Sequence, residues 1–170
     1  MRIILLIGIL STSGLCAADP APFGLEIGKT SITDLKKKYS VSKAGINAYS
    51  GGMMYKVSTA HIKFEGLKEL FVIFDKKGIL AAVMTKLPDY KFNYLLKSLR
   101  SKYTITSSEL PFVGSKEVKF KSGNTEITLR APHFSFSVSM NYLRKDFLDT
   151  YRRVNQRQKR QKQKRESSQL

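Results

Sequence analysis

The clearest pattern in the chain is an alternation of apolar and polar side chains over residues 134–142. Every second position is apolar, and serine or asparagine fills the positions between: the apolar residues are Phe134, Phe136, Val138, Met140 and Tyr142. A period of two residues is typical of a strand with one buried and one solvated face. We therefore predict a strand over residues 134–142 whose apolar side chains lie in the core.

Three other segments have the apolar spacing of helices. Ser31 and Asp34 resemble a capping box at the start of the first helix. Asp89 is placed to act as the N-cap of the second, which carries an apolar stripe up to Tyr103. The third begins near Arg144 and keeps an apolar edge for about three turns. We expect each helix to bury this apolar side against a sheet.

Short runs rich in β-branched and aromatic residues predict five more strands. They lie at residues 53–58, 67–74, 79–85, 117–121 and 125–130. Gly78 can adopt the positive φ that the tight turn between the second and third of these strands needs. Gly123 and Asn124 give a hairpin signal between the last two.

Two similar segments, Leu35 to Val41 and Leu99 to Ile105, lie 64 residues apart, and each ends a predicted helix. We therefore predict an α+β fold, a tandem repeat of a helix plus three antiparallel strands that forms a curved antiparallel sheet packed on helices. The predicted parts are repeat one (about 24–87), repeat two (about 88–143), a C-terminal helix (about 144–155) and a basic polar tail (156–170). Residues 19–155 then form a single domain.

The N-terminal segment has the pattern of a secretory signal peptide over residues 1–18. A positive start at Arg2 is followed by an apolar run over residues 3–10 and by small residues ahead of Asp19. Cys16, the one cysteine of the chain, stands within this segment. The residues before it do not fit a lipidation signal, because Leu15 is large, so cleavage after Ala17 or Ala18 is favoured over lipoprotein anchoring. We predict an exported protein, in the bacterial periplasm or secreted, with no cysteine in its mature chain.

Part of the sequence resembles a known class of exported domains. The features are the run FGLEIGKT at residues 23–30, a short helix ending in Tyr39, Tyr55, and a hairpin built on Phe74, Asp75 and Gly78. These resemble the small outer-membrane assembly lipoproteins of the SmpA/BamE kind and the tandem β-lactamase-inhibitor-protein-like domains. The resemblance covers residues 23–86 directly, and the missing lipidation signal departs from the lipoproteins. It implies a non-catalytic domain that presents a sheet face or loops to a protein partner.

The inventory of chemically reactive residues is small. His61 and His133 are the only histidines, and no local spacing supplies a second metal ligand. Nucleophile elbows, phosphate-binding loops and dinucleotide fingerprints are absent from the sequence. We therefore predict a protein that is not an enzyme and uses no cofactor or metal.

A long glycine-rich connection over residues 43–54 is the predicted contact loop for a protein partner in the cell envelope. It carries Ile46, Tyr49, Met53 and Met54, side chain types that supply contact area at recognition surfaces. Phe112 is its counterpart in the second half of the chain. The alternative is that the side chains of the first loop fold back over the core.

The charge of the chain suggests a second kind of ligand. Lys and Arg number 30 against 13 Asp and Glu, which gives a net charge of +17. Eight basic residues lie in the C-terminal segment: Arg152, Arg153, Arg157, Lys159, Arg160, Lys162, Lys164 and Arg165. Anionic lipid, lipopolysaccharide or a wall polymer is the polyanion that an exported protein would meet. Nucleic acid is disfavoured by export and by the absence of an aromatic residue after Tyr151. A solvated tail without a ligand stays open as well.

Overall fold

The computed structural model describes residues 18–169. The predicted signal peptide therefore lies outside the described residues except for Ala18, and so does Cys16. Within the described part, Asp19 fastens the start of the chain to the body, because its carboxylate accepts hydrogen bonds from Asn124 N and Thr125 Oγ1, each at 2.8 Å.

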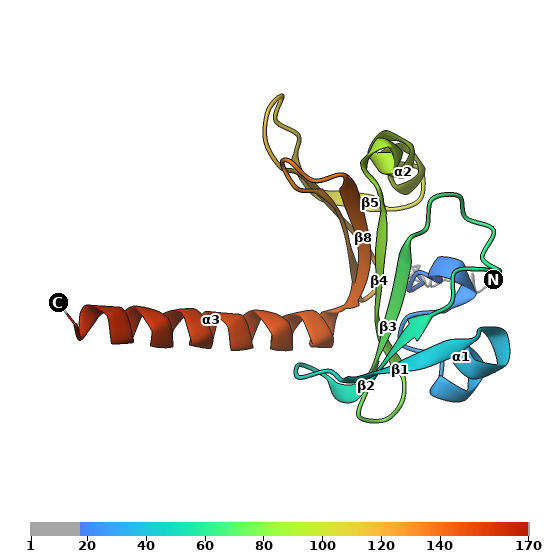
Figure 1. Ribbon diagram of the computed structural model, residues 1–170, viewed down its shortest axis with the longest axis horizontal. Coiled ribbons are helices and arrows are strands. Elements are labelled where there is room, and N and C mark those ends of the chain that lie inside the picture. Colours follow the sequence, from blue (N-terminus) through green and yellow to red (C-terminus); the bar gives the residue numbers. More distant parts are fainter. Residues whose placement is uncertain (1–17, 170) are drawn as a thin grey trace, which may run out of the picture.

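Within residues 18–169, eight strands form one open antiparallel sheet, together with three α-helices and two short 3₁₀ helices (Figure 1). Along the chain these are η1 (Pro22–Gly24), α1 (Ile32–Lys38), β1 (Val41–Ile46), β2 (Gly51–Val57), β3 (Glu69–Asp75), β4 (Leu80–Pro88), η2 (Asp89–Lys91), α2 (Phe92–Arg100), β5 (Thr104–Glu109), β6 (Lys116–Ser122), β7 (Thr125–Ala131), β8 (Ser137–Arg144) and α3 (Lys145–Ser167). The strand order is β1-β2-β3-β4-β8-β7-β6-β5. The α+β prediction is thus confirmed at the level of class and antiparallel sheet.

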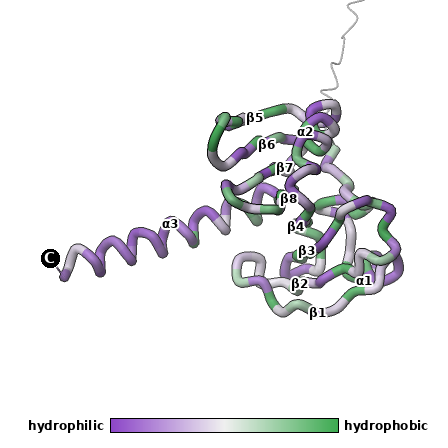
Figure 2. The backbone as a smooth tube through the Cα atoms, turned by 45° about the horizontal axis from the view of Figure 1, so that its top comes forward, coloured by the Kyte–Doolittle hydropathy of each residue, from purple (hydrophilic) through white to green (hydrophobic). Residues whose placement is uncertain are grey.

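Helices α1 and α2 and the N-terminal segment cover one face of the sheet (Figure 1). Leu35 of α1 and Leu95 of α2 belong to one continuous core with side chains from β2, β3, β4, β6, β7 and β8. The start of α3 packs on the opposite face, where Phe147 joins a smaller cluster with Ile73 and Ala82. Beyond this contact α3 extends away from the body, and Figure 2 shows it as hydrophilic along most of its length.

Several local predictions are confirmed. Ser31 and Asp34 form the capping box of α1, since Ser31 Oγ accepts from Asp34 N at 3.1 Å and Asp34 Oδ2 accepts from Ser31 N at 3.2 Å. Gly78 has a φ of 75° in the turn between β3 and β4. The N-cap prediction for Asp89 is wrong, because η2 comes first and α2 begins after Lys91 without a side-chain cap.

The predicted repeat unit, a helix plus three strands, is wrong, because four strands follow each of the first two helices. The strands that sequence analysis missed are β1 and β5, the two edges of the sheet. Most side chains of both are exposed, so neither shows a buried face or a period of two. The tandem duplication itself stays a prediction.

The predicted strand over residues 134–142 begins three residues later, at Ser137. Val138, Met140 and Tyr142 are buried as expected, but Phe134 and Phe136 are 93% and 86% exposed. The chain does not enter the sheet until Ser137 pairs with Pro88 of β4. The apolar alternation therefore continues from the core of the molecule into a solvent-exposed loop.

The C-terminal helix begins where predicted, at Lys145, but it does not end near residue 155. It continues to Ser167, so the predicted polar tail is helical over most of its length. Sequence analysis ended the helix where its apolar edge ended, which marks the limit of its contact with the body rather than the limit of its backbone structure.

Candidate functional site

Among the described residues, the most exposed apolar surface lies on two neighbouring loops at one end of the sheet. Residues 110–115 connect β5 to β6, and residues 132–136 connect β7 to β8. The strands that carry the loops are paired through Lys116 and Ala131. His133 N also donates a hydrogen bond to Ser115 Oγ at 3.0 Å. We call residues 110–115 and 132–136 the aromatic loop pair; the sheet holds both loops in one place.

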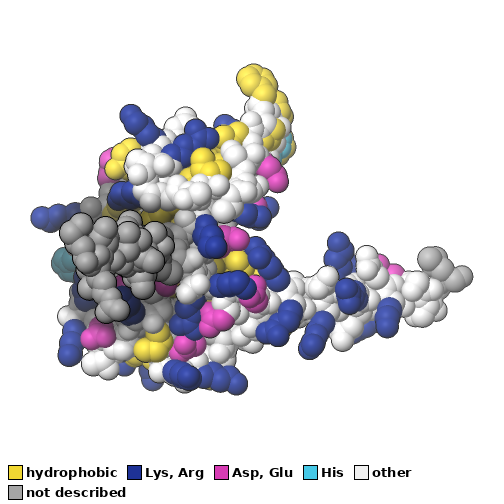
Figure 3. All heavy atoms as spheres, turned by 180° about the vertical axis from the view of Figure 1, so that it is seen from behind, with side chains coloured by type: hydrophobic (Ala, Val, Ile, Leu, Met, Phe, Trp, Pro, Cys, Tyr) yellow, Lys and Arg dark blue, Asp and Glu magenta, His cyan; other side chains and the backbone are white. Residues whose placement is uncertain are grey.

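Three phenylalanine side chains project from the aromatic loop pair almost without contact. Phe112 is fully exposed, and Phe134 and Phe136 are exposed nearly as far. Leu110 and Val113 are also exposed, at 41% and 69%. Single exposed apolar residues are ordinary on a soluble protein, but a contiguous cluster is typical of an interaction site. Figure 3 shows hydrophobic side chains gathered at this projecting tip.

The backbone at Phe134 is strained. Its φ is 57°, in the left-handed region that residues other than glycine, asparagine and aspartate seldom adopt. Its ring contacts the ring of His133, with 3.8 Å between centroids, and otherwise faces solvent. The strain is thus not offset by burial in the core, an arrangement more common at functional sites than elsewhere.

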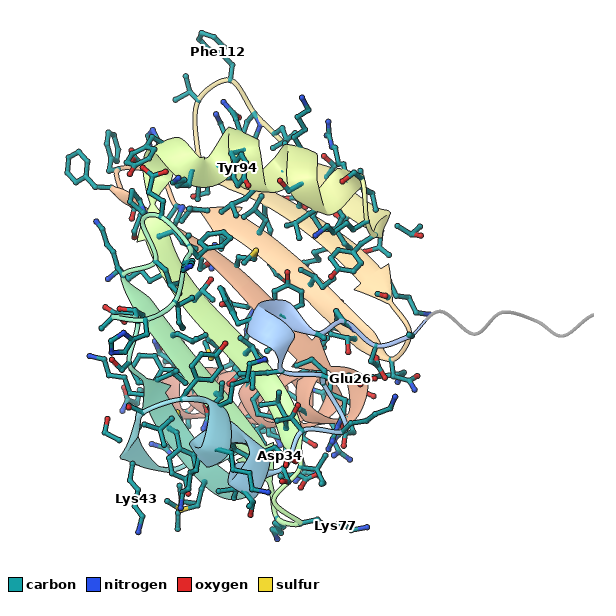
Figure 4. All side chains as sticks on the ribbon, turned by 90° about the vertical axis from the view of Figure 1, so that its right-hand side faces the viewer. Glu26, Asp34, Lys43, Lys77, Tyr94 and Phe112 are labelled. Atoms are coloured by element: carbon teal, nitrogen blue, oxygen red, sulfur yellow. The ribbon has the colours of Figure 1, made fainter. Side chains whose placement is uncertain are left out.

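Two tyrosines extend this surface onto the neighbouring helix. Asp89 N donates to the Phe136 carbonyl at 3.3 Å, which joins the second loop to η2. Tyr90 and Tyr94 follow on η2 and α2 and are 68% and 60% exposed. The Lys91 ammonium lies 5.8 Å and 5.6 Å from the centres of their two rings. Figure 4 shows Phe112 and Tyr94 at the same end of the molecule, with Lys77 at the other.

The second unusual surface is the free part of α3. The first turns of α3, by contrast, are held against the body by Phe147 and Leu148, both buried, and by Tyr151, whose ring lies 4.9 Å from that of Tyr49. Arg152 pairs with Glu126 at 3.0 Å. From Gln156 onward every described residue is exposed, and we call residues 156–167 the free part of α3.

The basic side chains of α3 surround the helix. Of the eight predicted polyanion contacts, Arg152 and Arg153 lie on the part beside the body, and the free part carries the others: Arg157, Lys159, Arg160, Lys162, Lys164 and Arg165. At 3.6 residues per turn their spacing distributes them over the whole circumference. Figure 3 shows Lys and Arg side chains along this helix. The one acid of the free part, Glu166, is 3.8 Å from Lys162.

The predicted contact loop over residues 43–54 is a β-hairpin, so its loop assignment is wrong. Ile46 is 71% exposed. Tyr49 and Met54 pack against the cluster around Phe147, and Met53 packs against the main core. The alternative of side chains that fold back over the body thus describes these three residues, whereas Phe112 is exposed as predicted.

Phe134 and Phe136 are the site residues that sequence analysis missed, because their alternation with serines matched a buried strand. Pro132 was the available signal, since a proline cannot donate a hydrogen bond to a sheet ladder and favours a loop. No pattern in the sequence showed where the strand would start pairing.

The described residues bring no catalytic set together. His61 and His133 are both exposed and lie in different loops. Between residues 18 and 169, no group of three or more His, Cys, Asp or Glu side chains is arranged to hold a metal ion. The carboxylate of Glu65 pairs with Lys91 at 2.9 Å, and this hydrogen bond lowers its pKa.

A groove of about 420 Å³ lies between α2 and the N-terminal segment. Its lining includes Phe64, Leu99, Tyr103 and Tyr142. Burial raises the pKa of the Tyr142 phenol, which keeps it neutral at physiological pH. The groove thus offers apolar contacts and neutral hydroxyls rather than an acid and base pair.

No protein family, curated protein or solved structure matches this chain. The resemblance to exported envelope domains stays a prediction. Among the described helices, none has an apolar stretch long enough to cross a bilayer.

Proposed function

We propose that this protein is an exported, non-enzymatic protein that binds an anionic surface of the cell envelope through α3. The observation that carries the proposal is the free part of α3, which projects from the body with six basic residues and one acid. A cation near an anionic membrane surface contributes about 1 kcal/mol. The contributions of the basic side chains that face the surface add together, so the helix can bind without any other contact.

The composition of the free part favours a ligand bound through charge over one bound through packed apolar side chains. Between Gln156 and Ser167 the helix has no apolar side chain, so it has no face that it could bury against a protein groove. Like charges three and four residues apart also destabilise it in isolation. A surface rich in negative charge removes this repulsion, and we expect the helix to be most stable when bound.

The net charge of +17 supports the same function at longer range. A basic protein is attracted to polyanions before contact, and this steering weakens as salt is added. The predicted signal peptide would deliver the protein to a compartment whose polyanions are lipid headgroups, lipopolysaccharide and wall polymers.

The other predicted ligand is a protein partner in the envelope. Only some of the residues predicted to contact it are exposed. Ile46 and Phe112 are exposed, whereas Tyr49, Met53 and Met54 pack against the body. A tandem duplication, with one helix and its strands in each half, fits the resemblance to domains that act through sheet faces or loops. That resemblance supports a function without catalysis and implies a protein partner, whereas the charge of α3 favours an anionic surface.

The test compares two triple variants with the same loss of charge. One replaces Lys159, Lys162 and Lys164 on α3 with Gln; the control replaces the exposed Lys37, Lys76 and Lys77 of the body with Gln. Binding of the mature chain to vesicles of phosphatidylethanolamine and phosphatidylglycerol is measured by sedimentation at increasing salt. We expect the α3 variant to bind roughly 30- to 100-fold more weakly and the control less than about threefold more weakly.

Equal losses in the two variants would mean that only net charge matters, and α3 would then have no special role. Unchanged binding in both would reject the proposal.

A further inference from the structure

We infer that the aromatic loop pair inserts into the interfacial layer of a lipid bilayer, so that the surface bound by α3 is a membrane. The inference rests on the proposed function for its electrostatic half. It adds an apolar contact, made by residues 110–115 and 132–136, that is not needed for binding through charge. Lipopolysaccharide sugars, wall polymers and other soluble polyanions offer these side chains no apolar medium.

The placement of the two surfaces is the first argument. Figure 1 shows that α3 and both loops of the pair project to the side of the sheet that faces away from α1 and α2. They leave opposite ends of the sheet, because α3 starts beside the turn at Asp75 and the loops lie at the Phe112 end. Figure 3 shows the same arrangement from behind. A surface on this side of the sheet can therefore meet the loops and the projecting end of α3 together.

The composition of the loops is the second argument. Neither loop contains an acidic residue, and the only ionisable side chain in either is that of His133. Insertion of these loops would move no carboxylate out of water. Tyr90 follows Asp89, which is hydrogen-bonded to the Phe136 carbonyl, and amphipathic rings of this kind are enriched at the level of lipid headgroups.

The form of the surface favours a bilayer over a protein. Phe112, Phe134 and Phe136 form a protruding cluster, each more than four-fifths exposed, at the projecting tip that Figure 3 shows. The anchors of protein interfaces fill shaped pockets on their partners. A bilayer interior needs no complementary shape, and the basic α3 complements the charge of anionic headgroups. An apolar contact combined with a basic one is the pairing that gives stable peripheral attachment.

The first experiment removes the apolar contact without touching α3. The variant combines Phe112→Ser, Phe134→Gly and Phe136→Ser; glycine accommodates the φ of 57° at position 134, and none of the three rings is buried, so the fold should persist. Vesicles of phosphatidylethanolamine and phosphatidylglycerol are compared with soluble polyphosphate. We expect roughly 10- to 100-fold weaker vesicle binding and unchanged polyphosphate binding.

These two probes separate the inference from the function on which it rests. Loss of polyphosphate binding in the α3 variant but not in the loop variant supports both. If the loop variant binds vesicles as well as the parent does, insertion is wrong while the role of α3 stands. If neither probe binds the parent protein, the proposed function fails first.

The second experiment measures how deeply the loop that carries position 112 inserts into the bilayer. The chain contains no tryptophan, so Phe112→Trp introduces a single reporter. We expect its emission to shift to shorter wavelength on anionic vesicles and to be quenched by brominated lipid. Lys77→Trp, at the opposite end of the sheet, is the matched control and should show neither effect. Unquenched emission from the vesicle-bound Phe112→Trp variant, or a shift produced by a protein partner in the absence of lipid, would overturn the inference.

Discussion

Arg144 is the residue on which the position of α3 depends most directly. Its guanidinium donates to Asp75 Oδ2 at 2.7 Å and to both oxygens of Asp146 at 2.7 Å and 2.8 Å. The Arg144 side chain is 17% exposed and that of Asp75 is 22% exposed, so these pairs are partly shielded from water. One side chain thus ties the end of β8 to the turn after β3 and to the first turn of α3.

This network predicts an acid-sensitive part of the stability. Burial raises the pKa of Asp75, but hydrogen bonds from Arg144 and from Ile79 N outweigh it and leave the pKa below 3.8. The hydrogen bond from Arg144 likewise lowers the pKa of Asp146. Carboxyls with lowered folded pKa values stabilise the protein above the ordinary value, and this contribution is lost as the pH falls through the folded values.

Replacing Arg144 with Met should show the effect. We expect the free energy of unfolding to fall by about 2 kcal/mol at neutral pH, since the variant leaves Asp75 partly buried without its partner. Between about pH 5 and pH 2 the variant should lose less additional stability than the parent. Urea unfolding at several pH values measures both effects. Parallel stability curves would show that Arg144 does not set the two pKa values.

At the scale of elements, α3 is divided into a docked part and a free part. Phe147 is 7% exposed and stands edge-to-face with Tyr49, at 6.4 Å between ring centres. The hairpin of β1 and β2 therefore serves as a support for the helix, which explains why Tyr49 is not available as a contact residue.

Phe147→Ala should weaken this support. We expect a loss of about 3 kcal/mol in unfolding free energy, because the ring leaves a cavity between the sheet and the helix. Phe112→Ala is the matched control, an identical substitution at a fully exposed site, and should change stability by less than about 0.5 kcal/mol. Thermal and urea unfolding of the two variants test this difference. Equal effects would mean that Phe147 is not a docking residue.

At the scale of the whole molecule, the sheet is joined through β4 and β8. Thr85, which is 5% exposed, donates from its hydroxyl to the Met140 carbonyl at 2.7 Å across this junction. The main core is continuous across it, since Val72 on one side and Ile127 on the other belong to the same cluster. We therefore expect the two halves to unfold together.

Thr85→Val tests this unity. The substitution keeps the side-chain shape and removes a buried hydrogen bond, for a loss of about 1 to 2 kcal/mol. Thr128→Val, at a half-buried position on β7, is the control and should change stability less. Circular dichroism and tyrosine fluorescence should report one coincident transition in both variants. Two separate transitions would show that the halves are independent units.

The predictions from sequence were reliable for elements that bury the side chains of one face. The stripe of α2 and the buried positions of β8 from Val138 onward follow from periods of 3.6 and two residues, and the capping box at Ser31 follows from its spacing to Asp34. The edge strands β1 and β5 had no such period, because each pairs on one side only and exposes most of its side chains. Periodicity records burial, so it cannot detect strands that bury little.

The sequence by itself determined the α+β class, the presence of the three α-helices, the charge of the C-terminal helix and the exposure of Phe112. Tertiary structure decided which apolar residues remain outside the core. Phe134 and Val138 have the same place in one alternating pattern, yet the first faces solvent and the second is buried. The reason is that pairing with β4 begins only at Ser137, and a partner strand fixes which part of a pattern enters the sheet.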